Sequence, residues 1–340
     1  MDITWLQTSW WILIGVLFTG YAILDGFDLG IGGIYFLTKD DKWRRTMLEA
    51  IGPVWDGNEV WLITGGGALF AAFPMAYATA FSGFYLALIL LLFMLIFRAI
   101  SIDVRSAREG KSWRSFWDAT FALSSVIAPL IMGVAFGNIA QGVPLTSDYE
   151  YYGNLLAQLN PYAILVGLMT LSLFVMHGVI YLVLKTPGEL NTWIRRWVTP
   201  SILLFIAMFI ITTLATLLFI PHMVTPFKEY PALLVVPLLT VLTIANIPRE
   251  IHHNREWRGF LFSSLSIVLL MVLYGIGMFP EMIHSSVAGN SLTAVNASSS
   301  EKTLGIMLII AGIGMPLVLA YTVTIYWVFR GKVDLDDNAG

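Results

Sequence analysis

The chain has 340 residues, of which 57% are hydrophobic and 12% are charged, and its mean hydropathy is +0.77. Soluble domains are about 25% charged, and the strands of transmembrane barrels alternate polar and apolar residues. This composition therefore excludes both classes and leaves a multi-span α-helical membrane protein. The net charge of −3 indicates no nucleic-acid partner, and the absence of cysteine excludes iron–sulfur clusters, thiolate-ligated haem and disulfides.

A helix that crosses the lipid bilayer needs about 20 predominantly apolar residues. Nine segments of the sequence meet this requirement, so we expect an all-α integral membrane protein with nine transmembrane helices. In chain order the predicted spans are 9–37, 53–73, 79–100, 117–138, 162–184, 199–220, 232–248, 258–280 and 304–329.

The lysines and arginines indicate the orientation of these helices. All of them except Lys228 and Lys302 lie in or beside the connections at one end of the predicted spans, or in the C-terminal tail. Cytoplasmic connections carry such an excess of cations. We therefore expect the N-terminus outside the cell and the C-terminus in the cytoplasm.

An internal repeat divides the sequence. Two groups of residues recur at nearly constant offsets, 146 for the first group and 144 for the second. The matched groups are Gly32, Ile34, Tyr35 and Lys39 with Gly178, Ile180, Tyr181 and Lys185, and Trp113, Arg114 and Phe116 with Trp257, Arg258 and Phe260. The repeat predicts two pseudo-symmetric four-helix bundles, residues 1–150 and 151–285, followed by a peripheral ninth helix and a cytoplasmic tail, residues 286–340.

Four acidic residues lie in or near the predicted membrane region. Asp25 and Asp28 belong to the first predicted span, and Asp56 and Glu59 belong to the start of the second. Each pair is spaced i, i+3 and so shares one helix face. At a rise of about 1.5 Å per residue, the depth from the cytoplasmic surface is roughly 4 Å for Asp56, 9 Å for Glu59, 12 Å for Asp28 and 16 Å for Asp25.

Ionisable groups at such depths are costly and commonly mark ion or proton pathways. A graded series of carboxyl groups that begins at the surface is suited to proton uptake from the cytoplasm, and the second bundle holds no equivalent acids. Structural interpretations stay open. Asp56 could stabilise the start of its helix through the helix dipole, and Asp28 or Glu59 could form an ion pair with Arg98.

His177 is the only histidine predicted to lie deep within a span. It could in principle serve as an axial haem ligand, although a hydrogen-bonded histidine that packs in the core is the commoner arrangement. We expect no metal site and no cofactor held by this chain alone.

Several motifs resemble subunit II of the cytochrome bd-type quinol oxidases over essentially the whole chain. They are DGFDLG at 25–30, WDGNEVWLIT at 55–64, GGALFAAFP at 66–74, AFSGFY at 80–85, GVAFGN at 133–138 and QGVP at 141–144. The resemblance implies a subunit of a bacterial cytoplasmic-membrane oxidase that pairs with a larger, similarly folded subunit I. Subunit I would hold two b-type haems, one d-type haem and the quinol site, and small single-span accessory subunits could join.

By the same resemblance the complex oxidises quinol, reduces oxygen to water and contributes to the proton gradient, and the isolated chain has no activity of its own. Asp28 and Asp56 then lie where family members carry acids associated with a proton path to the haems, whereas some members have Gln in place of Glu59. Two other classes remain open, a proton-coupled transporter built from a duplicated unit and a non-catalytic scaffold.

Overall fold

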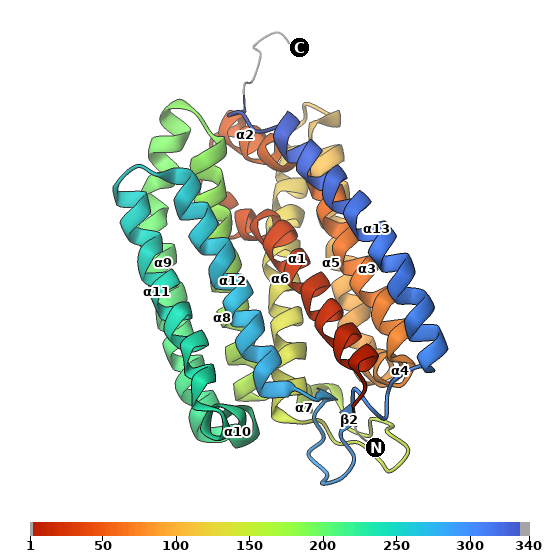
Figure 1. Cartoon of the computed structure of the whole chain (residues 1–340). Coiled ribbons are helices and arrows are strands. Elements are labelled where there is room, and N and C mark those ends of the chain that lie inside the picture. The colour runs from red at the N-terminus through yellow and green to blue at the C-terminus, as the bar shows by residue number, and fades with distance from the viewer. Residues whose placement is uncertain (1–2, 334–340) are drawn as a thin grey trace.

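The computed structural model describes residues 3–333, and most of these residues are helical (Figure 1). The helices are α1 (Trp5–Tyr35), α2 (Asp41–Ile51), α3 (Trp55–Ala72), α4 (Pro74–Gly83), α5 (Tyr85–Val104), η1 (Arg105–Ala107), α6 (Lys111–Gln141), α7 (Leu155–Gln158), α8 (Pro161–Lys185), α9 (Gly188–Phe219), α10 (Pro221–Glu229), η2 (Pro231–Leu234), α11 (Val235–His252), α12 (Glu256–Met278) and α13 (Glu301–Val328). A short hairpin of β1 (Glu281–Ile283) and β2 (Leu292–Thr293) joins α12 to α13.

Within residues 3–333, eight helices are long and apolar enough to cross a membrane, which confirms the prediction of an all-α multi-span protein. They are α1, α5 with η1, α6, α8, α9, η2 with α11, α12 and α13. The remaining predicted span, 53–73, coincides with α3. That helix is less apolar because Asp56, Asn58 and Glu59 occupy its first two turns, so a ninth span stays a prediction.

One connection and one predicted span differ from the pattern expected from the sequence. The stretch 38–52, expected only to link two spans, contains α2, and the Asp40 carboxylate caps this helix by accepting from the Trp43 amide. The predicted span 79–100 is divided at Phe84 between α4 and α5. A search for long apolar segments does not detect a short amphipathic helix such as α2. It also does not detect a break inside an apolar segment, such as the one at Phe84.

The two halves of the chain show the same pairing of helices. In the first half α1 packs against α3 and α6, and α5 packs against α6; in the second half α8 packs against α9 and α12, and α11 packs against α12. The halves meet where α1 and α6 cross α8. At this crossing a Cβ on Gly30 would lie 1.8 Å from the Phe174 carbonyl oxygen, so only glycine permits so close an approach.

The remaining long helix, α13, lies on the outside of the molecule beside α1 and α3 (Figure 1). The N-terminal end of α1 and the β-hairpin lie at one end of the helices, whereas α2 and the turn between α11 and α12 lie at the other (Figure 1). The second end is the one that carries most of the lysines and arginines.

Candidate functional site

A buried arginine joins three helices of the first half. Arg98 on α5 is completely buried, and its Nη2 lies 2.7 Å from Asp25 Oδ1 on α1 and 2.7 Å from Glu59 Oε1 on α3. From the sequence, Asp28 or Glu59 was considered as the ion-pair partner of Arg98. The structure shows the pair with Glu59 and adds Asp25, which had not been considered for this role.

Asp28 has a different partner. Its Oδ2 accepts a hydrogen bond of 2.7 Å from the Asn58 amide, which also donates to the Leu24 carbonyl at 2.9 Å. The Tyr326 hydroxyl on α13 donates to Asn58 Oδ1 at 2.9 Å. Asn58 therefore connects Asp28 to α13 and lies one residue from Glu59. Asn58 was not predicted to be part of the site, although its position between Asp56 and Glu59 in the sequence could have indicated it.

The burial of the four predicted acids follows a gradient. Asp56 is exposed in the first turn of α3, Glu59 is half-buried one turn further along, and Asp28 and Asp25 are completely buried. Burial thus increases from Asp56 to Glu59 to the inner pair, while Asp28 and Asp25 are equally buried, so their relative depth stays a prediction. The structure thus brings Asp25, Asp28 and Glu59 into one neighbourhood and leaves Asp56 at its rim.

Several polar atoms in this neighbourhood have no hydrogen-bond partner among residues 3–333. They are the Tyr21 hydroxyl, Asp25 Oδ1 and Oδ2, Asp28 Oδ1, and Arg98 Nε and Nη1. Asp25 Oδ1 has Arg98 beside it, but in an ion pair without hydrogen-bond geometry. Buried polar groups are normally satisfied by the protein or by ordered water.

A second ionic cluster lies at the cation-rich end of the first half. It was not predicted from the sequence. The Asp118 carboxylate on α6 accepts from the Tyr35 hydroxyl at 2.6 Å, from Arg44 at 2.8 Å and from Arg105 at 2.5 Å. Arg105 and Arg114 also bond Asp41, at 2.6 and 2.7 Å. Because every arginine of this cluster bonds an aspartate and the cluster ties α1, α2 and α6 together, its arrangement is that of a structural clamp.

His177 on α8 is completely buried, and both of its ring nitrogens have partners. Nδ1 lies 2.7 Å from the Ser263 hydroxyl, and Nε2 lies 3.0 Å from the Ile23 carbonyl oxygen. The ring also stacks on Phe260, with 4.9 Å between the centroids. A histidine with both nitrogens engaged and one face covered does not fit the requirements of an axial haem ligand. Within residues 3–333 no cluster of histidine, aspartate and glutamate is suited to a metal ion.

Comparison with known proteins agrees with this architecture. The family model for cytochrome bd terminal oxidase subunit II matches residues 6–329. The chain is 38% identical to the cytochrome bd-I ubiquinol oxidase subunit 2 of Escherichia coli (strain K12), with 99% of this chain and 97% of the relative covered. It is 32% identical to the cytochrome bd ubiquinol oxidase subunit 2 of Bacillus subtilis (strain 168), with 96% and 97% covered.

Among solved structures, a chain of the bd oxidase from Geobacillus thermodenitrificans has the same fold, with a TM-score of 0.81 at 14% identity. The superposition covers 96% of this chain and 99% of that one. The match over nearly the full length makes this chain a multi-pass bacterial membrane protein, one subunit of an oxidoreductase complex that contains haem and a partner subunit. The chain belongs to the family of cytochrome bd terminal oxidase subunit II.

Proposed function

We propose that this chain, as subunit II of a quinol:oxygen oxidoreductase, carries protons from the cytoplasm towards haems held by its partner. Asp56 would form the entrance, and Glu59, Asp28 and Asp25 would form the successive carriers. The partner would hold two b-type haems, one d-type haem and the quinol site. Ubiquinol is the substrate named for both relatives described above, and the choice between quinols is left to subunit I.

The burial gradient is the observation that carries this proposal. Four carboxyl groups run from an exposed residue, Asp56, to two completely buried residues, Asp28 and Asp25, on neighbouring helices. Asn58 and Arg98 hold the inner groups by hydrogen bonds and ion pairs. Proton transfer needs a series of groups that can gain and lose a proton, and carboxyl groups of increasing burial support such a series.

The charge balance supports the same role. Arg98 is the buried cation that pairs with Asp25 and Glu59, and Asp28 lies one helical turn from Asp25 and is bonded to Asn58. If all three carboxyl groups were ionised, two negative charges would be uncompensated in the protein interior, which is costly. A proton bound by one of the three carboxyl groups reduces this imbalance. Arg98 remains the fixed counter-charge when the proton moves from one carboxyl group to another.

A scaffold role is the second candidate, and the Arg98 ion pairs favour it. Buried ion pairs of this kind also occur as structural links between helices, in which case the carboxyl groups would remain ionised throughout the reaction. The two roles differ in what happens when a carboxylate becomes an amide. An amide preserves size and hydrogen bonding but cannot carry a proton.

The deciding experiment uses the complete oxidase with Asp28→Asn or Asp25→Asn. We expect both variants to assemble and to lose quinol oxidase turnover per haem, because each interrupts the buried part of the path. Lys111→Gln, which alters an exposed residue outside the path, is the control. Full turnover per haem in both variants would leave the chain a scaffold, whereas lower haem content with unchanged turnover per haem would indicate a structural role.

The proposed topology has nine spans, with the N-terminus outside and two pseudo-symmetric bundles, residues 1–150 and 151–285, before the ninth helix in residues 286–340. The equivalent helix pairs in the two halves support the duplication. The cations concentrated at one end of the helices support the orientation. Small accessory subunits would bind on lipid-facing helices and are not needed for the proposed path.

A further inference from the structure

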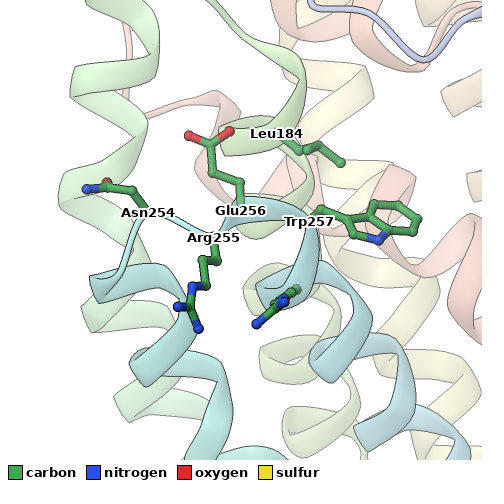
Figure 2. Close-up of a pocket in the computed structure, with 6 residues that line it drawn as sticks. Leu184, Asn254, Arg255, Glu256 and Trp257 are labelled. Carbon is green, nitrogen blue, oxygen red and sulfur yellow. The ribbon is translucent and has the colours of Figure 1, made fainter.

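A cavity of about 420 Å³ lies at the start of α12, beside the turn that joins it to α11 (Figure 2). Its lining residues are Leu184, Asn254, Arg255, Glu256, Trp257 and Arg258. The cavity is open to the surroundings of the helices, and it combines guanidinium groups with an indole ring and an aliphatic side chain. This combination is suited to an amphipathic anion.

The two arginines of this cavity are incompletely neutralised. Their side chains are 53% exposed for Arg255 and 60% exposed for Arg258. In the part of the chain that the structure describes, the only carboxylate within ion-pair distance of either is that of Glu250, with its Oε2 at 3.7 Å from Arg255 Nη1 and 3.9 Å from Arg258 Nη1. The Glu256 carboxylate is engaged by Arg195 instead. One acid therefore faces two cations, and guanidinium donors remain available.

The repeat relates these cations to first-half residues that form closer ion pairs. At the offset of 144, Arg105, Lys111 and Arg114 correspond to Arg249, Arg255 and Arg258, whereas Asp118 corresponds to Phe262. In the first half Arg105 and Arg114 are held at 2.5–2.7 Å by Asp118 and Asp41. In the second half the basic positions persist and the central acid is replaced by an apolar ring. With the Glu250 carboxylate at 3.9 Å, Arg258 is paired less tightly than its counterpart Arg114, and its donors can serve an external anion.

The position of Trp257 relates the cavity to the membrane. Its ring is 61% exposed at the end of a membrane-spanning helix, which is the level at which tryptophans lie among lipid headgroups. Arginine forks match the oxygens of phosphate groups, and basic pockets between helices at the cytoplasmic surface bind anionic headgroups.

We propose that this cavity binds the phosphate group of an anionic phospholipid. Arg255 and Arg258 would donate to the phosphate oxygens, and Trp257 and Leu184 would contact the glycerol and the upper acyl chain. Glu250 would remain the counter-charge of one guanidinium, so that one net positive charge faces the ligand. The same chemistry would accept free phosphate, and the two sources are separable by experiment.

The test uses the assembled oxidase, stripped of lipid in detergent and studied by native mass spectrometry. Phosphatidylglycerol or phosphatidylcholine of matched acyl chains is added at rising concentration. We expect phosphatidylglycerol to bind the unaltered complex more tightly than phosphatidylcholine. Arg255→Gln/Arg258→Gln should weaken its binding about tenfold, the effect of losing one or two charge-assisted contacts. Lys111→Gln/Arg330→Gln, which removes two exposed positive charges outside the cavity, should leave binding unchanged.

A second arm adds inorganic phosphate to the complex with bound phosphatidylglycerol. No displacement at millimolar phosphate identifies the lipid as the ligand, whereas displacement that disappears in Arg255→Gln/Arg258→Gln identifies a site for free phosphate as well. The proposal is overturned if the cavity variant binds phosphatidylglycerol as tightly as the control variant does, or if the unaltered complex does not discriminate between the two lipids. The single variants Arg255→Gln and Arg258→Gln provide the same comparison if the double variant assembles poorly.

Discussion

Arg98 on α5 and Asp25 on α1 form an ion pair in which neither side chain is exposed, with 2.7 Å between Nη2 and Oδ1. The same Arg98 nitrogen also lies 2.7 Å from the half-buried Glu59. A cation in this position fixes the relative placement of α1, α3 and α5 and sets the electrostatic potential around every buried acid of the candidate site. Its removal therefore affects both assembly and proton transfer.

The first prediction concerns Arg98 itself. Arg98→Gln leaves two carboxylates without their cation, and breaking a buried ion pair in this way costs about 3–5 kcal/mol. We expect much less assembled oxidase in membranes, measured as haem per milligram of membrane protein. Arg98→Gln combined with Asp25→Asn and Glu59→Gln should recover part of the assembly, because the two carboxylates that Arg98 pairs with are removed together with it. Equal yields for the single and triple variants would contradict this account.

The second prediction concerns Asn58, whose amide donates to Asp28 and to the Leu24 carbonyl. Asn58→Leu keeps a similar volume but leaves a buried carboxyl oxygen without its donor, which costs about 1–3 kcal/mol. We expect slower turnover per haem and a lower unfolding temperature. Tyr326→Phe removes only the hydrogen bond to Asn58 Oδ1 and should have a smaller effect on both. A larger loss of turnover in Tyr326→Phe than in Asn58→Leu would be inconsistent with the proposed order of contacts.

The third prediction separates the entrance of the path from its interior. Asp56 is exposed, so water can replace its carboxyl group, whereas Asp28 is completely buried. Asp56→Asn should therefore reduce turnover per haem less than Asp28→Asn does. If Asp56 only stabilises the start of α3, Asp56→Asn will have no measurable effect on turnover, because Asn is also accepted near helix starts.

The fourth prediction concerns pH and the histidines at the opposite end of the molecule. The rings of His222 and His284 stack with 3.8 Å between centroids, and His284 Nδ1 lies 2.5 Å from Glu281 Oε2. Burial, assisted by the nearby His284, lowers the pKa of His222 below its ordinary value of 6.5. Burial opposes ionisation of Glu281, but its hydrogen bonds with His284 and Ser291 and the electrostatic influence of the two histidines together outweigh burial and lower the pKa of Glu281.

The lowered pKa values of His222 and Glu281 both make the folded protein less stable as the pH falls. A group whose pKa is lower in the folded protein contributes its full stability above the unfolded pKa and loses it as the pH falls towards the folded pKa. For His222 this loss begins below about pH 6.5, and for Glu281 it begins below about pH 4.3. The unfolding temperature of the complex should therefore fall between pH 7.5 and pH 5.5, and it should fall less in His222→Gln. An equal decrease in both proteins would exclude a contribution from His222.

The sequence predicted much of the fold because long apolar runs identify membrane helices without any knowledge of their neighbours. It did not predict α2, whose residues are half polar, or the break at Phe84, which depends on how α4 packs at the end of the helices. The greater burial of Asp28 and Asp25 relative to Glu59 and Asp56 was predictable because depth follows from the rise per residue along two helices.

Contacts between helices were harder to predict. The Asp25–Arg98 pair depends on the rotation of α5 about its axis, and the bond from Tyr326 to Asn58 joins residues that are 268 positions apart. The Asp118 cluster was missed because its members lie near helix ends, where charged residues usually face water. In each case the partner is set by packing between helices, for which a single sequence carries no direct signal.

The most direct test of the proposed path is the rate of proton uptake when the reduced, oxygen-exposed complex turns over in lightly buffered detergent solution with a pH-indicator dye. We predict that Asp28→Asn slows proton uptake and haem reoxidation together, whereas the Lys111→Gln control matches the unaltered complex. Unchanged proton uptake in Asp28→Asn, at normal haem content, would contradict a path through this subunit.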